Sequence, residues 1–339
     1  MKHNRRLHIS LSVAVLVILG GAGARCFGQE PERGTSFGSG LKDHFTVVSA
    51  DGSSVSPAVD SLLETIRSEV SDAMTSCGLT LGSTSEPLVW RYFGHRDAYR
   101  RYASSVDHAS PAFVDAYYST RNNYVVLYCE ALPTVWSTAE PHNSGQSSVR
   151  LAATNSARTD NQSLSTERIV VLTHEMTHQL AYNSGLQKRG VMYPLWVSEG
   201  LATHFERCAL SDVQRRSYAG RAHQLAELGA TGRLIPLSQL AVMTGQDSLA
   251  SSSSDAYAQY WGLMSFLLER HPEALNAYLA DFAQRPMGRR APASLRKDFV
   301  TYFGRIDALE TQWWQFVASL AQTKSVGAPA LRESDTAGL

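Results

Sequence analysis

Cysteine is scarce in this chain, and its spacing argues against the common thiolate metal sites. The 339 residues include four cysteines, and no two of them form a C-x-x-C pair. A zinc site built on cysteine is therefore not expected. In an oxidising compartment the four residues could pair, so a structural disulfide and free buried thiols both stay open. These residues are Cys26, Cys77, Cys129 and Cys208.

The chain also lacks an excess of either charge. Acidic and basic residues number 31 each, so the formal net charge is zero. This balance predicts neither a basic surface for nucleic acid nor a run of carboxylates for cation storage. Beyond the N-terminal residues, no segment of the sequence is apolar enough to suggest a membrane span. The length allows one large domain or two ordinary ones.

The N-terminal residues have the pattern of a secretory signal. Basic residues occupy the first positions, and an almost unbroken apolar run follows over residues 9–19. This run is shorter than the roughly 20 residues that a bilayer span needs. The small residues Ala22 and Ala24 then predict cleavage after residue 24. We expect a signal peptide over residues 1–24 and a protein that is secreted, periplasmic or in the cell envelope. An uncleaved N-terminal anchor is the alternative.

The apolar pattern predicts an α+β fold in two parts. Residues 42–132 mix short β-prone runs with helices, and A-Y-Y and Y-V-V-L-Y bracket an asparagine-containing turn, which predicts a β-hairpin over 116–128. Residues 167–322 show helical spacing almost throughout. Polar, aromatic-poor stretches predict the remaining segments. These are a flexible leader at 25–41, an exposed loop at 133–166 and a disordered tail at 323–339.

Helix and strand boundaries follow from spacing, capping residues and turn residues. Ser165 or Thr166 is expected to cap the helix that follows, and one continuous helix is expected over 211–228. The other expected helices cover 56–76, 96–103, 194–208, 256–270, 272–282, 293–303 and 308–321, and the expected strands begin near 44 and 87.

The stretch H-E-M-T-H at residues 174–178 is the most specific chemical feature of the chain. Residues four apart on a helix project from one face, so His174 and His178 can offer two imidazole nitrogens to one zinc ion. Glu175 lies about 100° further round the helix and suits a general base. The apolar residues on the opposite side, Ile169, Leu172, Met176 and Leu180, predict that the core fixes this orientation. Two histidines that share a helix by chance are the alternative.

A third ligand is needed, because a catalytic zinc site uses three protein ligands and leaves one position open. The segment W-V-S-E-G-L-A places Glu199 on a second predicted helix, which the loop at 185–193 returns toward the first. A carboxylate buried against two histidines without an ion would be costly, so exposure of Glu199 at the surface is the alternative. His204 and Glu206 are the competing ligands.

The combination of H-E-M-T-H and W-V-S-E-G-L-A resembles the gluzincins, zinc peptidases with a glutamate ligand on the next helix. The chain is most similar to their peptidase-MA-like branch, and in particular to a family of uncharacterised secreted bacterial proteins with a tyrosine-rich hairpin and a Y-A-Q-x-W helix. The resemblance covers roughly residues 44–320. It implies a zincin-like fold in which His174, His178 and Glu199 bind Zn²⁺ and Glu175 is the base.

The resemblance also implies a role for Tyr257 in Y-A-Q-Y-W. Aminopeptidase relatives place a tyrosine near the scissile carbonyl, where its hydroxyl steadies the oxyanion. Packing of Tyr257 in the core against Trp261 is the alternative. The chain has no G-x-M-E-N element, which in aminopeptidases holds the free amine of the substrate, so we expect an endopeptidase rather than an aminopeptidase.

The expected function is therefore that of a secreted zinc metallopeptidase acting on a peptide or protein substrate. A catalytically inactive, zinc-stabilised binding or scaffold domain is the first alternative. A metal-free structural protein of the envelope and a hydrolase of peptidoglycan cross-links are the others.

Overall fold

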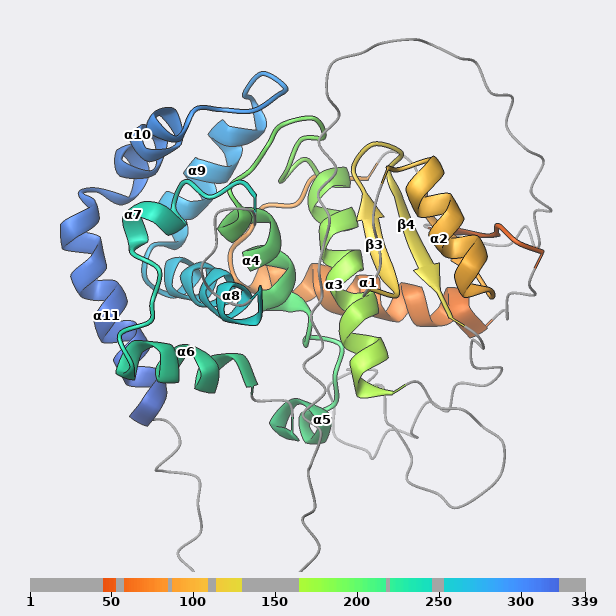
Figure 1. The fold of residues 1–339 in the computed structure, drawn as a ribbon, viewed down its shortest axis with the longest axis horizontal. Coiled ribbons are helices and arrows are strands. Elements are labelled where there is room, and N and C mark those ends of the chain that lie inside the picture. Colours follow the sequence, from red (N-terminus) through yellow and green to blue (C-terminus); the bar gives the residue numbers. More distant parts are fainter. Residues whose placement is uncertain are drawn as a thin grey trace, which may run out of the picture.

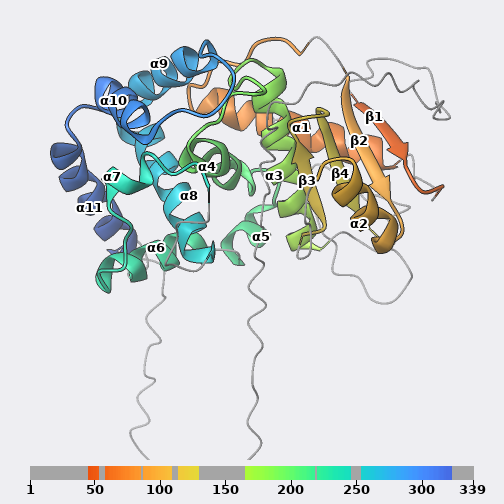
Figure 2. The ribbon, with the colours of Figure 1, turned by 45° about the horizontal axis from the view of Figure 1, so that its top comes forward.

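A small mixed sheet stands beside a group of helices, and helix α3 (Thr166–Asn183) lies between them (Figures 1 and 2). The structure is a computed structural model. It describes residues 45–52, 58–84, 87–108, 114–129, 165–217, 220–245 and 253–322. The predicted signal peptide, leader and tail lie outside these residues, as does almost all of the predicted loop at 133–166. The described part has the expected α+β composition.

The sheet has the strand order β1-β2-β4-β3. Neighbouring strands β1 (Phe45–Ser49), β2 (Leu88–Phe93) and β4 (Tyr124–Tyr128) run parallel, and β3 (Ala116–Ser119) runs antiparallel to β4 at one edge. The predicted hairpin is thus confirmed. Asn123 closes its turn at φ 59°, a left-handed conformation that asparagine tolerates better than most residues.

The helices agree with the predicted ones except between residues 211 and 245. The structure describes two helices, α5 (Asp212–Ser217) and α6 (Gly220–Ala230), in the stretch where one was expected, and residues 218–219 lie outside the described residues. The short α7 was not predicted. The remaining helices are α1 (Ala58–Ser76), α2 (Arg96–Ser105), α4 (Leu195–Phe205), α7 (Leu237–Leu240), α8 (Ser253–Arg270), α9 (Pro272–Ala283), α10 (Pro292–Phe303) and α11 (Ile306–Gln322).

The two faces of the sheet belong to different clusters, because successive strand residues point to opposite sides. Tyr117 packs with residues of α2 in a small aromatic cluster. Tyr118 and Trp90 belong to the main core with α1 and α3. Gln179 fixes α3 to the sheet, since it accepts a hydrogen bond from Trp90 Nε1 at 2.7 Å and donates to the Val89 carbonyl at 3.1 Å.

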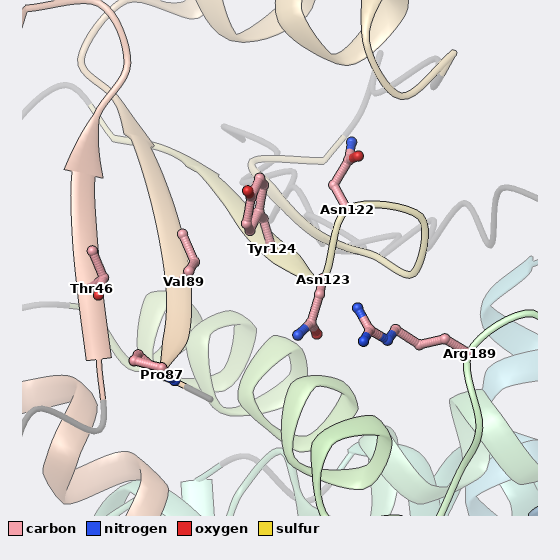
Figure 3. A pocket seen from close by; sticks show the side chains of 7 residues that line it. All are labelled: Thr46, Pro87, Val89, Asn122, Asn123, Tyr124 and Arg189. Carbon is pink, nitrogen blue, oxygen red and sulfur yellow. The ribbon is translucent and has the colours of Figure 1, made fainter. Parts of the chain in front are cut away.

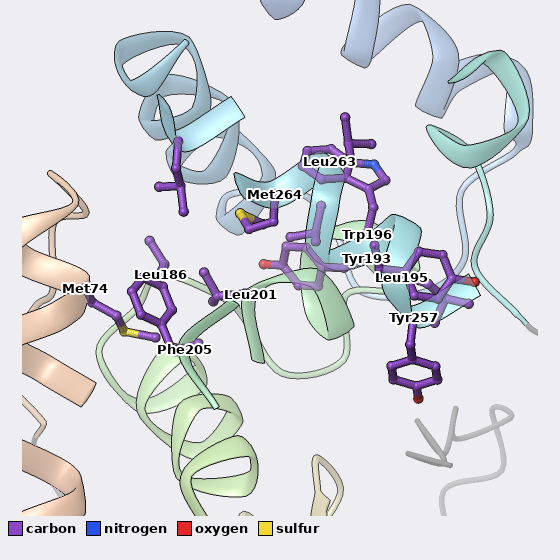
Figure 4. Close-up of a cluster of buried hydrophobic side chains, with 14 of the residues drawn as sticks. Met74, Leu186, Tyr193, Leu195, Trp196, Leu201, Phe205, Tyr257, Leu263 and Met264 are labelled. Carbon is purple, nitrogen blue, oxygen red and sulfur yellow. The ribbon is translucent and has the colours of Figure 1, made fainter. Parts of the chain in front are cut away.

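Helix α4 is held by close packing against α8. A Cβ atom on Gly200 would lie 2.6 Å from the Tyr260 carbonyl oxygen, so only glycine allows this approach. Apolar side chains of both helices, including Leu201, Leu263 and Met264, gather around the contact (Figure 4). The packing fixes the position of Glu199, which directly precedes Gly200.

Two further expectations concern the membrane and the thiols. Within the described residues, no helix is both long enough and apolar enough to cross a membrane. Among the described residues, no disulfide joins Cys77, Cys129 and Cys208 to one another. Cys26 lies outside the described residues.

Candidate metal centre

Helix α3 is oriented by its cap and by its apolar side. The Ser165 hydroxyl accepts a hydrogen bond from the Arg168 backbone amide, which satisfies one free donor of the first turn. The predicted apolar residues of the helix, Ile169, Leu172, Met176 and Leu180, are all buried in the main core. The core therefore holds the side of the helix away from the histidines, as predicted.

The structure brings His174, His178 and Glu199 together in one buried group. The Nε2 atom of His174 lies 3.6 Å from Glu199 Oε2, and that of His178 lies 3.7 Å from Glu199 Oε1. One ligand atom from each residue lies within 4.8 Å of the other two. Both histidines are almost completely buried, and Glu199 is 0% exposed. The surface position considered for Glu199 is therefore wrong.

The free atoms of this group fit a metal ion. Neither Nε2 atom and neither Glu199 oxygen has a hydrogen-bond partner among the described residues. Such buried polar groups are normally satisfied, so their convergence indicates a missing partner that accepts electron pairs. Two ligand atoms at about 2.0–2.1 Å from a tetrahedral ion are about 3.3–3.4 Å apart. The observed separations of 3.6 and 3.7 Å need only a small adjustment.

A buried carboxylate holds His174 from the other side of its ring. His174 Nδ1 donates to Glu206 Oε2 at 3.2 Å, which leaves Nε2 free to face the ion. Arg221 in turn donates to both Glu206 oxygens, at 2.7 and 3.0 Å. The sequence left Glu206 as a competing metal ligand, but in the structure its carboxylate contacts Nδ1 of His174, on the other side of the ring from Nε2. Such outer carboxylates fix the tautomer and orientation of a metal-binding histidine.

The electrostatics of the metal-free group couple its members. Burial acts to lower the pKa of His174, but the nearby carboxylates of Glu199 and Glu206 outweigh it and raise that pKa to about 10. Burial acts to raise the pKa of Glu199, but the nearby His178 and His174 bring it down to about 2. Glu199 is therefore ionised at neutral pH, and His174 holds a proton that a metal ion must displace.

Glu175 has the environment of a proton acceptor that is kept free. It is 0% exposed, and the backbone of Tyr118 lies near its carboxylate, but neither oxygen has a hydrogen bond of normal geometry among the described residues. Burial raises the pKa of Glu175 and outweighs the lowering effect of His174 and His178. A raised carboxyl pKa brings the group closer to the value that suits proton transfer near neutrality.

His204 and Tyr257 are the remaining candidate site residues from the sequence. His204 Nδ1 lies 2.8 Å from Ser265 Oγ on α8, and burial lowers the pKa of His204 to about 4, so this histidine is not part of the ligand group. Tyr257 is buried (Figure 4). Its ring centroid lies 5.7 Å from that of Tyr260. The guanidinium of Arg221 lies 6.0 Å from the Tyr257 ring, which connects this residue to the Glu206 side of the centre.

Tyr260 was not predicted as a site residue. It is 0% exposed, and its hydroxyl has no hydrogen-bond partner among the described residues. Burial, followed by the charge of Glu199, raises the pKa of Tyr260, so the hydroxyl keeps its proton and can donate. The sequence indicates a role for Tyr260 only in that this second tyrosine follows Tyr257 by three residues on the same predicted helix.

Comparison with protein families finds a match over part of the chain. Residues 168–287 match a family described as a protein of unknown function, DUF1570. This stretch contains the three ligands, Glu175, Glu206 and both tyrosines of α8. The comparison with curated proteins found no match. The family match and the buried ligand group together fit a metal-dependent protein.

Proposed function

We propose that this protein is a zinc-dependent peptidase that cuts within peptide chains, outside the cytoplasm. The observation that carries the proposal is the convergence of His174, His178 and Glu199 with their coordinating atoms unsatisfied, beside an unsatisfied Glu175. The resemblance of the sequence to gluzincins and the N-terminal signal pattern support the reaction and the location.

The ligand set favours zinc over other abundant divalent ions. Imidazole nitrogens suit zinc, whereas magnesium and calcium prefer oxygen ligands. Two imidazoles and one carboxylate leave a fourth position open, as catalytic zinc sites require. When bound, zinc polarises the substrate carbonyl and lowers the pKa of its water toward neutrality.

The remaining steps are then assigned to individual residues of the chain. Glu175 accepts the proton of the attacking water and passes it to the leaving amine. Burial keeps competing solvent from this carboxylate, and the raised pKa favours the return of the proton. Glu206 holds the His174 ring in one tautomer, and Arg221 holds Glu206. We assign to Tyr257 the support of the developing oxyanion, which its hydroxyl can give by donating a hydrogen bond.

The sheet edge next to the centre supports a peptide as the substrate. Among the described strands, β3 pairs on one side only, with β4. Its Tyr118 ring stacks on His178 with 6.5 Å between centroids, so this edge, which has no second strand partner among the described strands, runs beside the candidate ligands. An extended peptide can add to such an edge through main-chain hydrogen bonds.

Substitution of the base tests the proposal. In zinc-loaded protein we expect Glu175→Gln to lower kcat on casein by about 10²- to 10⁴-fold while zinc stays bound, because only the proton transfer is lost. Glu167→Gln, at an exposed position in the first turn of the same helix, is the matched control and should keep activity. A chelator should abolish the wild-type activity.

Two outcomes would contradict the proposal. Near-normal turnover by Glu175→Gln would remove this residue from the mechanism. One equivalent of bound zinc without cleavage of casein or of a diverse peptide library would instead favour the inactive, zinc-stabilised scaffold.

A further inference from the structure

A hollow of about 330 Å³ lies at the end of the sheet where three parallel strands begin (Figure 3). Thr46, Val89 and Tyr124 line it from neighbouring strands, where they are paired across the sheet in register. Asn122 and Asn123 of the hairpin turn, Pro87 and Arg189 complete the lining. The hollow therefore borders the end of β3, the strand whose edge passes the metal ligands.

Arg189 is carried to the hollow by a tight turn between α3 and α4. The Val191 amide donates to the Lys188 carbonyl at 3.3 Å, and Gly190 adopts φ +83°, which glycine allows. The Gly288 amide donates to the Gly190 carbonyl at 2.7 Å and anchors the turn. The guanidinium of Arg189 points toward Asn123 (Figure 3).

The charge at the hollow is positive. Within the described residues, Arg189 forms no ion pair, and no carboxylate lines the hollow. A second guanidinium, that of Arg91, lies 4.7 Å from the centroid of the Tyr124 ring and has no carboxylate partner there either. The carboxylate of Asp107 accepts hydrogen bonds from Tyr117, Ser119 and Asn122, and it does not itself line the hollow. The hollow thus suits an anion.

The hollow is connected to the metal centre through Asn123. Its amide exchanges two hydrogen bonds with the Asn183 amide at the end of α3, both at 2.8 Å. The Tyr118 hydroxyl donates to Asn123 Oδ1 at 2.7 Å, and the Tyr118 ring stacks on His178. Two side chains, Asn123 and Tyr118, thus lead from the lining of the hollow to His178, so a carboxylate bound at the hollow would belong to a substrate residue that is not itself at the cleaved bond.

We infer that Arg189 binds a carboxylate of the substrate, at one fixed position relative to the cleaved bond. This inference rests on the proposed peptidase function and adds its specificity. Arginine recognises carboxylates through paired, charge-assisted hydrogen bonds. The carboxylate could belong to an aspartate or glutamate side chain or to the C-terminus of a peptide, and the two sources can be separated by experiment.

The test combines binding with cleavage. Zinc-loaded Glu175→Gln protein binds fluorescent peptides without cutting them, and the wild type cuts the same set. The peptides carry Glu or Gln at each position near the cleaved bond and end in an acid or an amide. We expect one position, or the C-terminal acid, to improve binding and kcat/KM by about tenfold. Arg189→Gln should abolish that preference.

The control variant is Arg121→Gln. Arg121 is exposed on the same hairpin turn and does not line the hollow, so this change removes an equal charge nearby. Loss of the preference in Arg189→Gln alone supports the inference. Cleavage without any acidic preference, or an equal loss in both variants, overturns it and leaves the peptidase function intact. Absence of both binding and cleavage in the wild type overturns the peptidase function itself.

Discussion

Asp107 and Glu199 are both completely buried carboxylates, yet their surroundings differ in one respect. Asp107 accepts hydrogen bonds from Tyr117, Ser119 and Asn122 at 2.7–2.8 Å. Glu199 has two histidine nitrogens at 3.6 and 3.7 Å and no hydrogen bond within the described residues. The fold satisfies the Asp107 carboxylate with hydrogen bonds, whereas the Glu199 carboxylate would be satisfied by an ion bound between it and the two histidines.

This difference separates a structural acid from a ligand. A buried charge is retained when it is paired and hydrogen-bonded, because an unsatisfied one costs several kcal/mol. Asp107 meets that condition and ties α2 to the hairpin. Glu199 meets it only when something binds between it and the histidines. Substitutions at the two sites should therefore have opposite consequences for stability and for metal binding.

The largest effect is expected for Glu199→Gln, which removes a charged ligand. Zinc affinity should fall by more than the 10- to 100-fold typical of losing an outer partner. The rise in Tm that zinc produces in the wild type should disappear, because that rise follows from metal binding to the folded state. Calorimetric titration and thermal unfolding with and without zinc measure both. Wild-type affinity in this variant would remove Glu199 from the ligand set.

The converse substitution is Asp107→Ala, which leaves three buried donors without an acceptor. We expect the free energy of unfolding to fall by about 3 kcal/mol. Zinc affinity of the folded protein should stay unchanged. Asp115→Ala is the matched control, because this carboxylate is partly exposed in its ion pair with Arg96 and its loss should cost less than about 1 kcal/mol. Denaturant unfolding of both variants measures the difference, and equal losses would contradict the comparison.

A smaller effect is expected for Glu206→Gln, which weakens the support behind His174. The amide oxygen can still accept from Nδ1, but the charge that Arg221 holds is lost. Zinc affinity should decrease by about 10- to 100-fold. Glu227→Gln on α6, an exposed position, should leave the affinity unchanged. If Glu206→Gln binds zinc as the wild type does, Glu206 has no role in holding the ligand.

The smallest expected effect is the change in apparent zinc affinity for each unit of pH. Without a metal ion, the pKa of His174 is raised to about 10, because the nearby carboxylates of Glu199 and Glu206 outweigh burial. Zinc must then displace a proton below that pH, so apparent affinity should rise by up to about tenfold per pH unit between about pH 6 and 9. Glu199, with a pKa of about 2, contributes no proton in this range.

Calorimetry in two buffers with different ionisation enthalpies measures this proton release directly. Close to one proton per zinc is expected at pH 7. Binding without proton release would show that His174 is already neutral in the metal-free protein.

The sequence predicted most helices and strands because their apolar spacing is regular and their caps are local. Ser165 and the asparagine turn of the hairpin are such local features. The two separate helices α5 and α6 were not predicted, because a single glycine within a helical pattern is a weak indication of a helix boundary. The place of Glu206 was also missed, since nothing in its spacing distinguishes a ligand from the partner of a ligand.

Local sequence was enough to specify which side chains α3 presents together. Histidines four apart on one helix must share a face, and the glutamate between them must point elsewhere, because helix geometry depends only on local hydrogen bonds. Which distant residues complete the centre depends instead on long-range packing. Packing of α4 on α8 through Gly200 set Glu199 opposite both histidines. The ion pair from α6 placed Glu206 behind His174, and the turn at Lys188–Val191 brought Arg189 to the hairpin.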